Sequence, residues 1–432
     1  MKKALKILWT IIVVIAALLF TAWLLIQMPA VQTFVAKKVT SSLEENLGGR
    51  IEFSKIHLKP FNALVIKDFR LIDENPSTTP SMEVLDTMAS AASLTATFSL
   101  KGLFKKEGLH LGRVSVSDGS FTFVTEQEGS NLKRIFKISP KEKTEKKEMG
   151  SVFDADKVQV DGFRFRLINL RHARESVEWG INWTDMDVTV KKLSAKDLSL
   201  AGGYMRGSVE KLEAREKSGY HIVDLNGDVT VGGGRTLIED LKLVDDWSDI
   251  NMKEFSMGYD SIDSFDDFID AVRLGGDIRQ SVIDFKSLSY FAPSLKRMDV
   301  RFVVPKADVD GPVSDLGIDW IEFTESGSSV SGTASGRITG LPDIDRTVMD
   351  FDVEDLSFTS GGLGKFIGGF APSSKLDLSR YASGEKAIFD GKVHGTLNNM
   401  SVKGHADMGP MGGLTADLKL SDLIKQGGSK VF

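Results

Sequence analysis

The sequence predicts a mainly β protein, in which an N-terminal transmembrane helix precedes an elongated, bent antiparallel β-sheet (a β-taco or groove) with a few short helices. Three observations support this fold class. An uncharged stretch long enough to span a bilayer stands near the N-terminus. Apolar and polar residues alternate through much of the chain after position 50. The 41 glycines, several of them in Asn-Gly or Asp-Gly pairs, supply turns.

The transmembrane helix is predicted at residues 7–26, which carry no charge and would span roughly 30 Å as a helix. Lys2, Lys3 and Lys6 precede it, so the N-terminus should stay cytoplasmic and the remaining chain should be exported. A cleaved signal peptide is the alternative, although its apolar region usually runs about 7–15 residues. We therefore expect a single-pass anchor in an inner membrane and a periplasmic body. The anchor residues are Ile7, Trp9, Ile12, Val14, Leu18, Phe20, Trp23, Leu25 and Ile26.

Five sections are predicted along the chain. They are 1–28, the cytoplasmic tip and signal anchor; 29–138, a helix and a first β section; 139–150, a charged linker or loop; 151–282, a second β section; and 283–432, a third β section with an internal repeat, expected to continue in a longer parent protein. The linker mixes both charge signs and holds no apolar residue before Met149.

Composition narrows the possible functions. The chain has no cysteine, which excludes disulfides and thiol chemistry. Its net charge is −6, spread along the sequence, whereas nucleic-acid binding favours a basic face.

A helix is predicted after the anchor, because apolar residues recur at helical spacing over 31–47 and Gly48-Gly49 would end it. This helix would cap the first sheet, or lie on the membrane surface with the help of Lys37 and Lys38, or do both.

Short strands are predicted over residues 50–73 and a further strand over 94–100, while the polar, proline-containing residues 75–80 are predicted to form a loop. The nearly alternating apolar residues that end the first segment are Leu64, Ile66, Phe69 and Leu71.

A repeated pattern predicts the apolar surface. Residues 113–125 and 157–169 each hold two valines two apart, an Asp-Gly pair, and two phenylalanines two apart. Asp161-Gly162 predicts a tight hairpin turn, and a period of two places the valines on one face and the phenylalanines likewise. Arg164 and Arg166 fall on the opposite face. The candidate groove lining is Val114, Val116, Phe121, Phe123, Val158, Val160, Phe163, Phe165 and Leu167.

The same turn chemistry recurs at Asn226-Gly227, Asp310-Gly311 and Asp390-Gly391. Helices are predicted to interrupt the strands at 264–272, where Ser264 can cap, and at 362–370, where glycines weaken the prediction.

An internal repeat occupies the C-terminal half. Residues 290–294 (YFAPS) recur as 369–373 (GFAPS), and an Asp-Gly pair follows each copy at a similar distance. Repeats of this kind are typical of an extended stack of similar β units.

No catalytic or metal site stands out, so we expect no enzyme activity, no cofactor and no metal. No nucleophile or phosphate-binding motif occurs in a strand–turn–helix setting, and no histidine has a second ligand at metal spacing. Asp245-Asp246 and Asp266-Asp267 are expected on solvated turn or helix surface. Residues 231–235 (VGGGR) are expected to form a turn between strands rather than a phosphate cradle. The histidines are His57, His110, His172, His221, His394 and His405.

An antiparallel sheet with one apolar face must bury that face. A closed sandwich would bury it against a second sheet, whereas a bent sheet would leave a trough able to shield lipid acyl chains, at roughly 0.8 kcal/mol per buried CH₂. Alternation alone does not separate the two, but the anchor, the missing catalytic groups and the repeats favour the trough. A periplasmic structural scaffold or protein-binding β module without a lipid conduit is the alternative, and an anchored hydrolase has no positive support.

The layout resembles the AsmA-like superfamily, and within it most closely the N-terminal part of translocation and assembly module subunits of the Bacteroidetes TamB type. The resemblance covers nearly the whole chain. It rests on the Lys-flanked anchor, on QMPAVQTFVA (27–36), GGRIEF (48–53), VIKDFRL (65–71) and FDGKVHGTL (389–397), and on the repeated Phe-Ala-Pro element.

The resemblance implies a bridge-like protein with a β-taco groove that acts in phospholipid transport between the inner and outer membrane and in outer-membrane protein assembly. The implied partners are membrane phospholipid, the inner membrane and a BamA-family outer-membrane barrel of the TamA type, with no nucleic acid. TamB proteins are longer and contact the barrel through a C-terminal domain that is not seen before Phe432. We therefore expect either a piece of a longer protein or a short relative.

Overall fold

The computed structural model describes residues 48–59, 63–79, 83–98, 109–127, 129–135, 153–171, 177–371, 386–421 and 430–431. The predicted anchor, the helix at 31–47 and the linker at 139–150 lie outside these residues. Within the described ranges no helix is both long and apolar enough to cross a membrane. The described residues form two compact units, the first within 1–175 and 183–202 and the second within 176–182 and 203–432.

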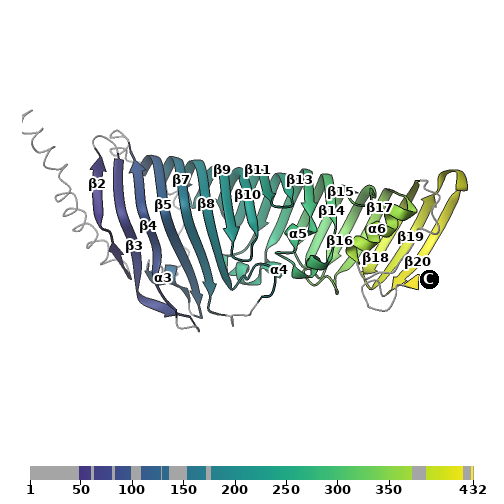
Figure 1. The fold of residues 1–432 in the computed structure, drawn as a ribbon, viewed down its shortest axis with the longest axis horizontal. Helices are drawn as coiled ribbons and strands as arrows, with labels where there is room; N and C mark the ends of the chain where they lie inside the picture. Colours follow the sequence, from purple (N-terminus) through teal and green to yellow (C-terminus); the bar gives the residue numbers. More distant parts are fainter. Residues whose placement is uncertain are drawn as a thin grey trace, which may run out of the picture. The chain divides into compact units, whose positions relative to one another are not determined.

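The first unit is an open sheet of long strands (Figure 1). β5, β7 and β8 have 18, 17 and 17 residues. Neighbouring strands are antiparallel except β5 and β7, which run parallel. The elements are β1 (Gly49–Glu52), β2 (Lys55–Lys59), β3 (Ala63–Thr78), β4 (Val84–Thr97), β5 (Leu109–Glu126), β6 (Gly129–Ser130), α3 (Asn131–Ile135), β7 (Phe153–Asn169) and β8 (Asp185–Ala201).

α3 is held at one end of this sheet by Arg134. Its guanidinium donates to the Asp73 carboxylate at 2.6 Å and to Glu126 at 2.6 Å. The Asp73 side chain is 1% exposed, so a charge-assisted hydrogen bond there replaces water. The Gly48 N–H also donates to the Ile135 carbonyl at 2.8 Å. The helix therefore closes the sheet end where β3 and β5 terminate.

The second unit is an antiparallel meander, in which each strand from β9 to β20 pairs with the next (Figure 1). Its strands are β9 (Tyr204–Glu216), β10 (His221–Gly232), β11 (Arg235–Asp245), β12 (Asp249–Gly258), β13 (Arg273–Asp284), β14 (Arg301–Pro312), β15 (Asp315–Glu325), β16 (Ser331–Thr339), β17 (Val348–Phe358), β18 (Ala387–Thr396), β19 (Asn399–Asp407), β20 (Gly413–Ser421) and β21 (Lys430–Val431). Its helices are η2 (Ile262–Asp267), α4 (Phe268–Ala271), α5 (Phe285–Leu288), η3 (Pro293–Arg297), α6 (Ser360–Phe370) and η5 (Gly409–Met411). The predicted fold class is thus confirmed as mainly β, with open antiparallel sheet and few short helices.

The hairpin prediction for the Asp-Gly and Asn-Gly pairs is wrong. All of these pairs lie inside strands: Asp118-Gly119 in β5, Asp161-Gly162 in β7, Asn226-Gly227 in β10, Asp310-Gly311 in β14 and Asp390-Gly391 in β18. The positive φ that such pairs favour is used instead for kinks, as at Gly162 with φ +68°. The predicted turn at 231–235 is confirmed, because Gly233-Gly234 joins β10 to β11.

Two further local predictions need correction. β3 continues to Thr78, so residues 75–78 are strand rather than loop; Asn75 N–H donates to Asp73 Oδ1 at 3.0 Å and Ser77 pairs with Leu85. Ser264 lies inside η2 and does not cap a helix, since α4 begins at Phe268. The helix predicted at 362–370 is confirmed as α6, capped by Thr359 Oγ1, which accepts from the Gly362 N–H at 3.0 Å.

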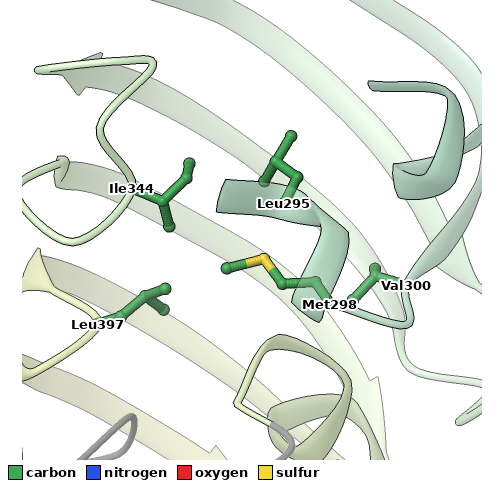
Figure 2. Close-up of a cluster of buried hydrophobic side chains, with 5 residues drawn as sticks. All are labelled: Leu295, Met298, Val300, Ile344 and Leu397. Carbon is green, nitrogen blue, oxygen red and sulfur yellow. The ribbon is translucent and has the colours of Figure 1, made fainter. Parts of the chain in front are cut away.

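The internal repeat accompanies a helical connection in both copies, of which the second is described only as far as Ala371. The first copy, with α5 and η3, connects β13 to β14, and the second, with α6, connects β17 to β18. Both helical segments contribute to one buried apolar cluster, in which Leu295 of η3 and Met298 just after it lie near Ile344 and Leu397 from two loops (Figure 2). The residues drawn are Leu295, Met298, Val300, Ile344 and Leu397.

Candidate functional site

The predicted lining residues lie side by side on the first unit. Because β5 and β7 are parallel, the two copies of the repeated pattern match in register. The opposed pairs are Val114–Val158, Val116–Val160, Phe121–Phe165 and Phe123–Leu167, with Phe163 opposite Gly119. Residues directly opposite each other share a face of the sheet. The Phe121 and Phe165 rings stack with centroids 6.2 Å apart.

This surface extends onto β3, β4 and β8. One row of directly paired residues is Ile66, Leu94, Val116, Val160 and Leu193, and another is Leu71, Ala89, Phe121, Phe165 and Val188. We call this surface the apolar face of the first unit. Apart from Val160, which is buried, the predicted lining residues are only half-buried. Apolar side chains on this face therefore remain accessible among the described residues.

A row of kinks runs across the middle of the apolar face. Asp68, Asp118 and Gly162 have left-handed φ values of +53°, +48° and +68°. Asp118 lies opposite Gly162, between the pairs Ser117–Asp161 and Gly119–Phe163. The kinks therefore occur at a shared level, which keeps the strands in register.

Each kink resets the alternation of side chains. In an unkinked strand Val116 and position 119 would lie on opposite faces. A Cβ added at Gly119 would instead meet Val116 Cγ1 at 3.0 Å and Phe163 Cδ2 at 2.7 Å, so all three lie on one side. This explains why apolar residues occur at positions 114, 116, 121 and 123, and at 64, 66, 69 and 71.

The opposite face of the first unit carries ion pairs, and near the ends of β5 and β7 it also holds the buried apolar residues Val124 and Ile168. Arg164 Nε donates to Asp187 Oδ1 at 2.8 Å, and Arg166 Nη1 donates to Glu83 Oε1 at 2.7 Å. These hydrogen bonds raise the pKa of both guanidinium groups, although burial acts in the other direction. The sheet thus carries fixed charge on one face and half-buried apolar groups on the other.

The second unit has its own apolar face, which the sequence analysis did not assign. Two rows of directly paired residues cross its strands. The first is Val229, Ile238, Phe255, Gly276, Val309, Ile318, Gly336, Phe351, Val393, Val402 and Leu418. The second is Leu241, Met252, Ile278, Ala307, Ile321, Ala334, Val353, Gly391, Gly404 and Ala416. Apolar and polar residues alternate within each of these strands, which predicts one apolar face per strand. The sequence does not show the register that aligns those faces from strand to strand.

Three of the four glycines in these rows, Gly336, Gly391 and Gly404, lie beneath aromatic rings, while Gly276 faces Val309 and Met252. A Cβ at Gly404 would meet Phe389 Cζ at 2.7 Å, and one at Gly336 would meet Phe351 Cδ1 at 2.8 Å. The missing side chains make room for the rings, which restore apolar contact over an otherwise bare backbone. The rows are therefore continuous in apolar surface even where they contain glycine.

The polar face of the second unit holds a ladder of opposed carboxylates. The ladder consists of Asp228, Glu239, Glu254, Asp277 and Asp308. Directly opposed like charges are destabilising. Cations offset the repulsion, since Arg235 pairs with Glu254 at 2.6 Å and Lys306 with Asp308 at 3.6 Å.

Helical segments cover parts of both apolar faces. In the first unit, Ile135 of α3 packs in a cluster with Leu71, Met88 and Phe121. In the second unit, α5, η3 and α6 pack on the sheet, and Phe370 of α6 contacts the cluster of Figure 2.

The carboxylate pairs Asp245-Asp246 and Asp266-Asp267 lie in different surroundings. Asp245 is buried, which corrects the expectation of a solvated turn. Its Oδ1 accepts from the Ser248 N–H at 2.7 Å and from Ser287 Oγ at 2.8 Å. Burial, followed by the nearby Asp245 charge, raises the pKa of Tyr220, whose hydroxyl donates to Asp245 Oδ2 at 3.3 Å. Asp266 and Asp267 are exposed on η2, as expected.

The described histidines are not gathered into a metal site. His110 contacts Asp154, and His221 Nδ1 lies 2.8 Å from Asp246 Oδ1. Among the described residues no group of three or more His, Asp or Glu side chains is placed to hold a metal ion. His172 lies outside these residues.

Comparison with known proteins adds no assignment. The chain matches no protein-family model, no curated protein and no solved structure.

Proposed function

We propose that the chain is an AsmA-like protein of the TamB type, anchored in the inner membrane with its body in the periplasm. In this proposal the apolar face of each unit binds phospholipid acyl chains in transit between the inner and outer membrane during envelope biogenesis. The observation that carries the proposal is the set of apolar rows that cross strand after strand while the opposite face stays charged.

The physical argument concerns what an open apolar face requires. Half-buried residues such as Phe163, Phe165 and Phe351 leave apolar area in water. An acyl chain laid along the rows would remove that area, and its own, from water, worth roughly 0.8 kcal/mol for each fully buried CH₂. A lipid head group would stay in solvent. Kinks at one level in neighbouring strands support a bend of the sheet around such a chain.

A part in outer-membrane protein assembly with a BamA-family barrel belongs to the same proposal. It rests on the family resemblance alone, and no described residue is assigned to that contact.

The test is native mass spectrometry of the full chain, extracted from a Gram-negative inner membrane into nanodiscs and released from them. We expect phospholipid to remain bound to the wild type. Phe163→Asp combined with Phe165→Asp places two charges on the apolar face of β7. This double variant should lose the phospholipid bound to the apolar face of the first unit. The matched control, Gln159→Asp combined with Thr189→Asp, adds two charges to the polar face and should leave retention unchanged.

A wild type without lipid would contradict the proposal and favour the scaffold or protein-binding alternative. Circular dichroism of both double variants checks that the sheet remains folded. Equal loss of lipid in both variants would mean that retention does not depend on the apolar face.

A further inference from the structure

α6 lies over an aromatic cluster on the apolar face of the second unit. The cluster comprises Phe285, Phe302, Phe323, Phe366 and Phe370, of which the last two belong to α6. The Phe302 ring lies 6.3 Å from Phe366 and 6.2 Å from Phe370. Phe302 also packs against Ile278 and Ala307 of the second apolar row. α6 therefore occupies surface that the rows would otherwise present.

The contacts that hold α6 are mainly apolar. Ile367 packs against Ala371 and Leu420, and Thr359 caps the first turn. Phe366 and Phe370 are only half-buried. An acyl chain could replace these ring contacts with contacts of the same kind. The exchange would then cost the stability of the helix itself and the hydrogen bond that the Asp299 N–H donates to the Gly369 carbonyl at 3.0 Å.

That stability is low by composition, because five of the eleven residues of α6 are glycine. Glycine inside a helix is disfavoured about fivefold relative to alanine at each position. An isolated helix of this length is also marginal in water. α6 therefore depends on its packing against the sheet.

Close approach requires only some of these glycines. A Cβ at Gly362 would lie 2.7 Å from the Ser328 carbonyl oxygen, and one at Gly369 would lie 2.9 Å from that of Asp299. Gly361 and Gly368 face open space, with nothing within 4 Å of an added Cβ and no left-handed φ. The fold would accept alanine at these two positions, yet the sequence keeps the helix weak there.

We propose that α6 is a displaceable cover, and that an acyl chain and α6 occupy the aromatic cluster in alternation. This inference rests on the proposed function. It assigns the surface around Phe302 as a gated acyl-chain site, whereas the described cover of the first unit, α3, contains no glycine and is held by the ion pair of Arg134 with Asp73.

The experiment uses the full chain in nanodiscs that contain a phospholipid with a diazirine in its acyl chain. Light-induced cross-links are mapped by mass spectrometry to β14, under the cover, and to β7, on the first unit. Hydrogen exchange of α6 is measured in parallel. Gly361→Ala combined with Gly368→Ala should slow exchange of α6 on the order of 20-fold. The same variant should reduce cross-linking to β14 several-fold and leave cross-linking to β7 unchanged.

Gly258→Ala is the matched control, since Gly258 lies in β12 with ordinary φ and an added Cβ would have its nearest neighbour at 3.9 Å. It should change neither readout. Slower hydrogen exchange of α6 with unchanged cross-linking to β14 would contradict the proposal that α6 is a displaceable cover. It would not contradict the proposed binding of lipid to the apolar faces. Cross-linking to β7 but never to β14 would do the same. No cross-link to either strand in the wild type would overturn the proposed function itself, and the cover with it.

Discussion

The two units build an apolar face from strands of different length. The first uses strands of up to 18 residues, kinked at a shared level so that side-chain alternation resets without loss of register. The second uses strands of at most 13 residues, in which Asp240, Gln280 and Asp355 also have left-handed φ, and its helical segments between strands fold back over the face. Kinks therefore occur in strands of either length, and the described parts of the two units differ in how much of the apolar face helical segments cover.

The largest expected effect is the loss of stability when α3, the one described cover of the first unit, loses its ion pair. Arg134→Ala removes the cation that pairs with Asp73, whose side chain is 1% exposed, and leaves a buried carboxylate without its partner. Breaking a buried ion pair from one side costs about 3–5 kcal/mol. We expect the free energy of unfolding of the first unit to fall by about 3 kcal/mol. Hydrogen exchange resolved by peptide should show faster exchange in β3 and β5 and no change in β14.

Arg134→Ala combined with Asp73→Asn is the control, because it removes both charges. It should recover part of the loss. If the single variant left exchange in the first unit unchanged, α3 would not depend on this pair.

The next effect compares a glycine under an aromatic ring in each unit. Gly119→Ala places a Cβ 2.7 Å from Phe163 Cδ2, and overpacking of this kind costs about 1–3 kcal/mol. Phe163→Leu in the same chain should relieve it, because the obstacle is a side chain. Gly336→Ala in the second unit should not be rescued by Phe351→Leu. There the added Cβ also meets the Asp350 carbonyl oxygen, and φ is +155°.

Urea denaturation of the four variants, followed unit by unit through peptide-resolved exchange, measures both pairs. Rescue of Gly336→Ala by Phe351→Leu would show that ring contact alone selects glycine in both units.

The same residues show how far the sequence could predict the fold. Alternation identified Val114, Phe121, Phe163 and their neighbours as one apolar set, and the structure places them together on one face. The Asp-Gly pairs gave a wrong hairpin prediction, because a positive φ is needed both for tight turns and for kinks inside strands. Only the neighbouring strand shows which one is formed, since Asp118 and Gly162 are kinked opposite each other.

The apolar face of the second unit was harder to predict for a different reason. Its rows join single residues from strand to strand, so a strand contributes only one position to each row. Register depends on turn length and on irregularities such as that between Asn226 and Asp228, which shift pairing by one residue. A single shift moves every later position to the other face, and alternation within one strand does not contain that information.

The smallest expected effect concerns a turn of the second unit and its response to pH. Glu325, at the end of β15, is buried, which alone would raise the pKa of its carboxyl group. Hydrogen bonds from the Ser328 hydroxyl and from the N–H groups of Gly327 and Ser328 outweigh burial and lower that pKa below its ordinary value of 4.5. A carboxylate with a lowered pKa stabilises the folded state above pH 4.5. This contribution is lost as pH falls through the lowered value, because the carboxylate takes up a proton.

Glu325→Gln should therefore reduce the stability of the second unit by about 1 kcal/mol at pH 7, and the difference from wild type should shrink as pH falls below about 4.5. Glu322→Gln, which removes an exposed carboxylate from the same strand, should show no such pH-dependent difference. Urea denaturation at pH 7 and at pH 3.5 measures both. A Glu325→Gln deficit that persisted unchanged at pH 3.5 would mean that the turn depends on the shape of this side chain and not on its charge. The second unit would then close its β15–β16 turn by packing, as it covers its apolar face, whereas the first unit holds its cover through an ion pair.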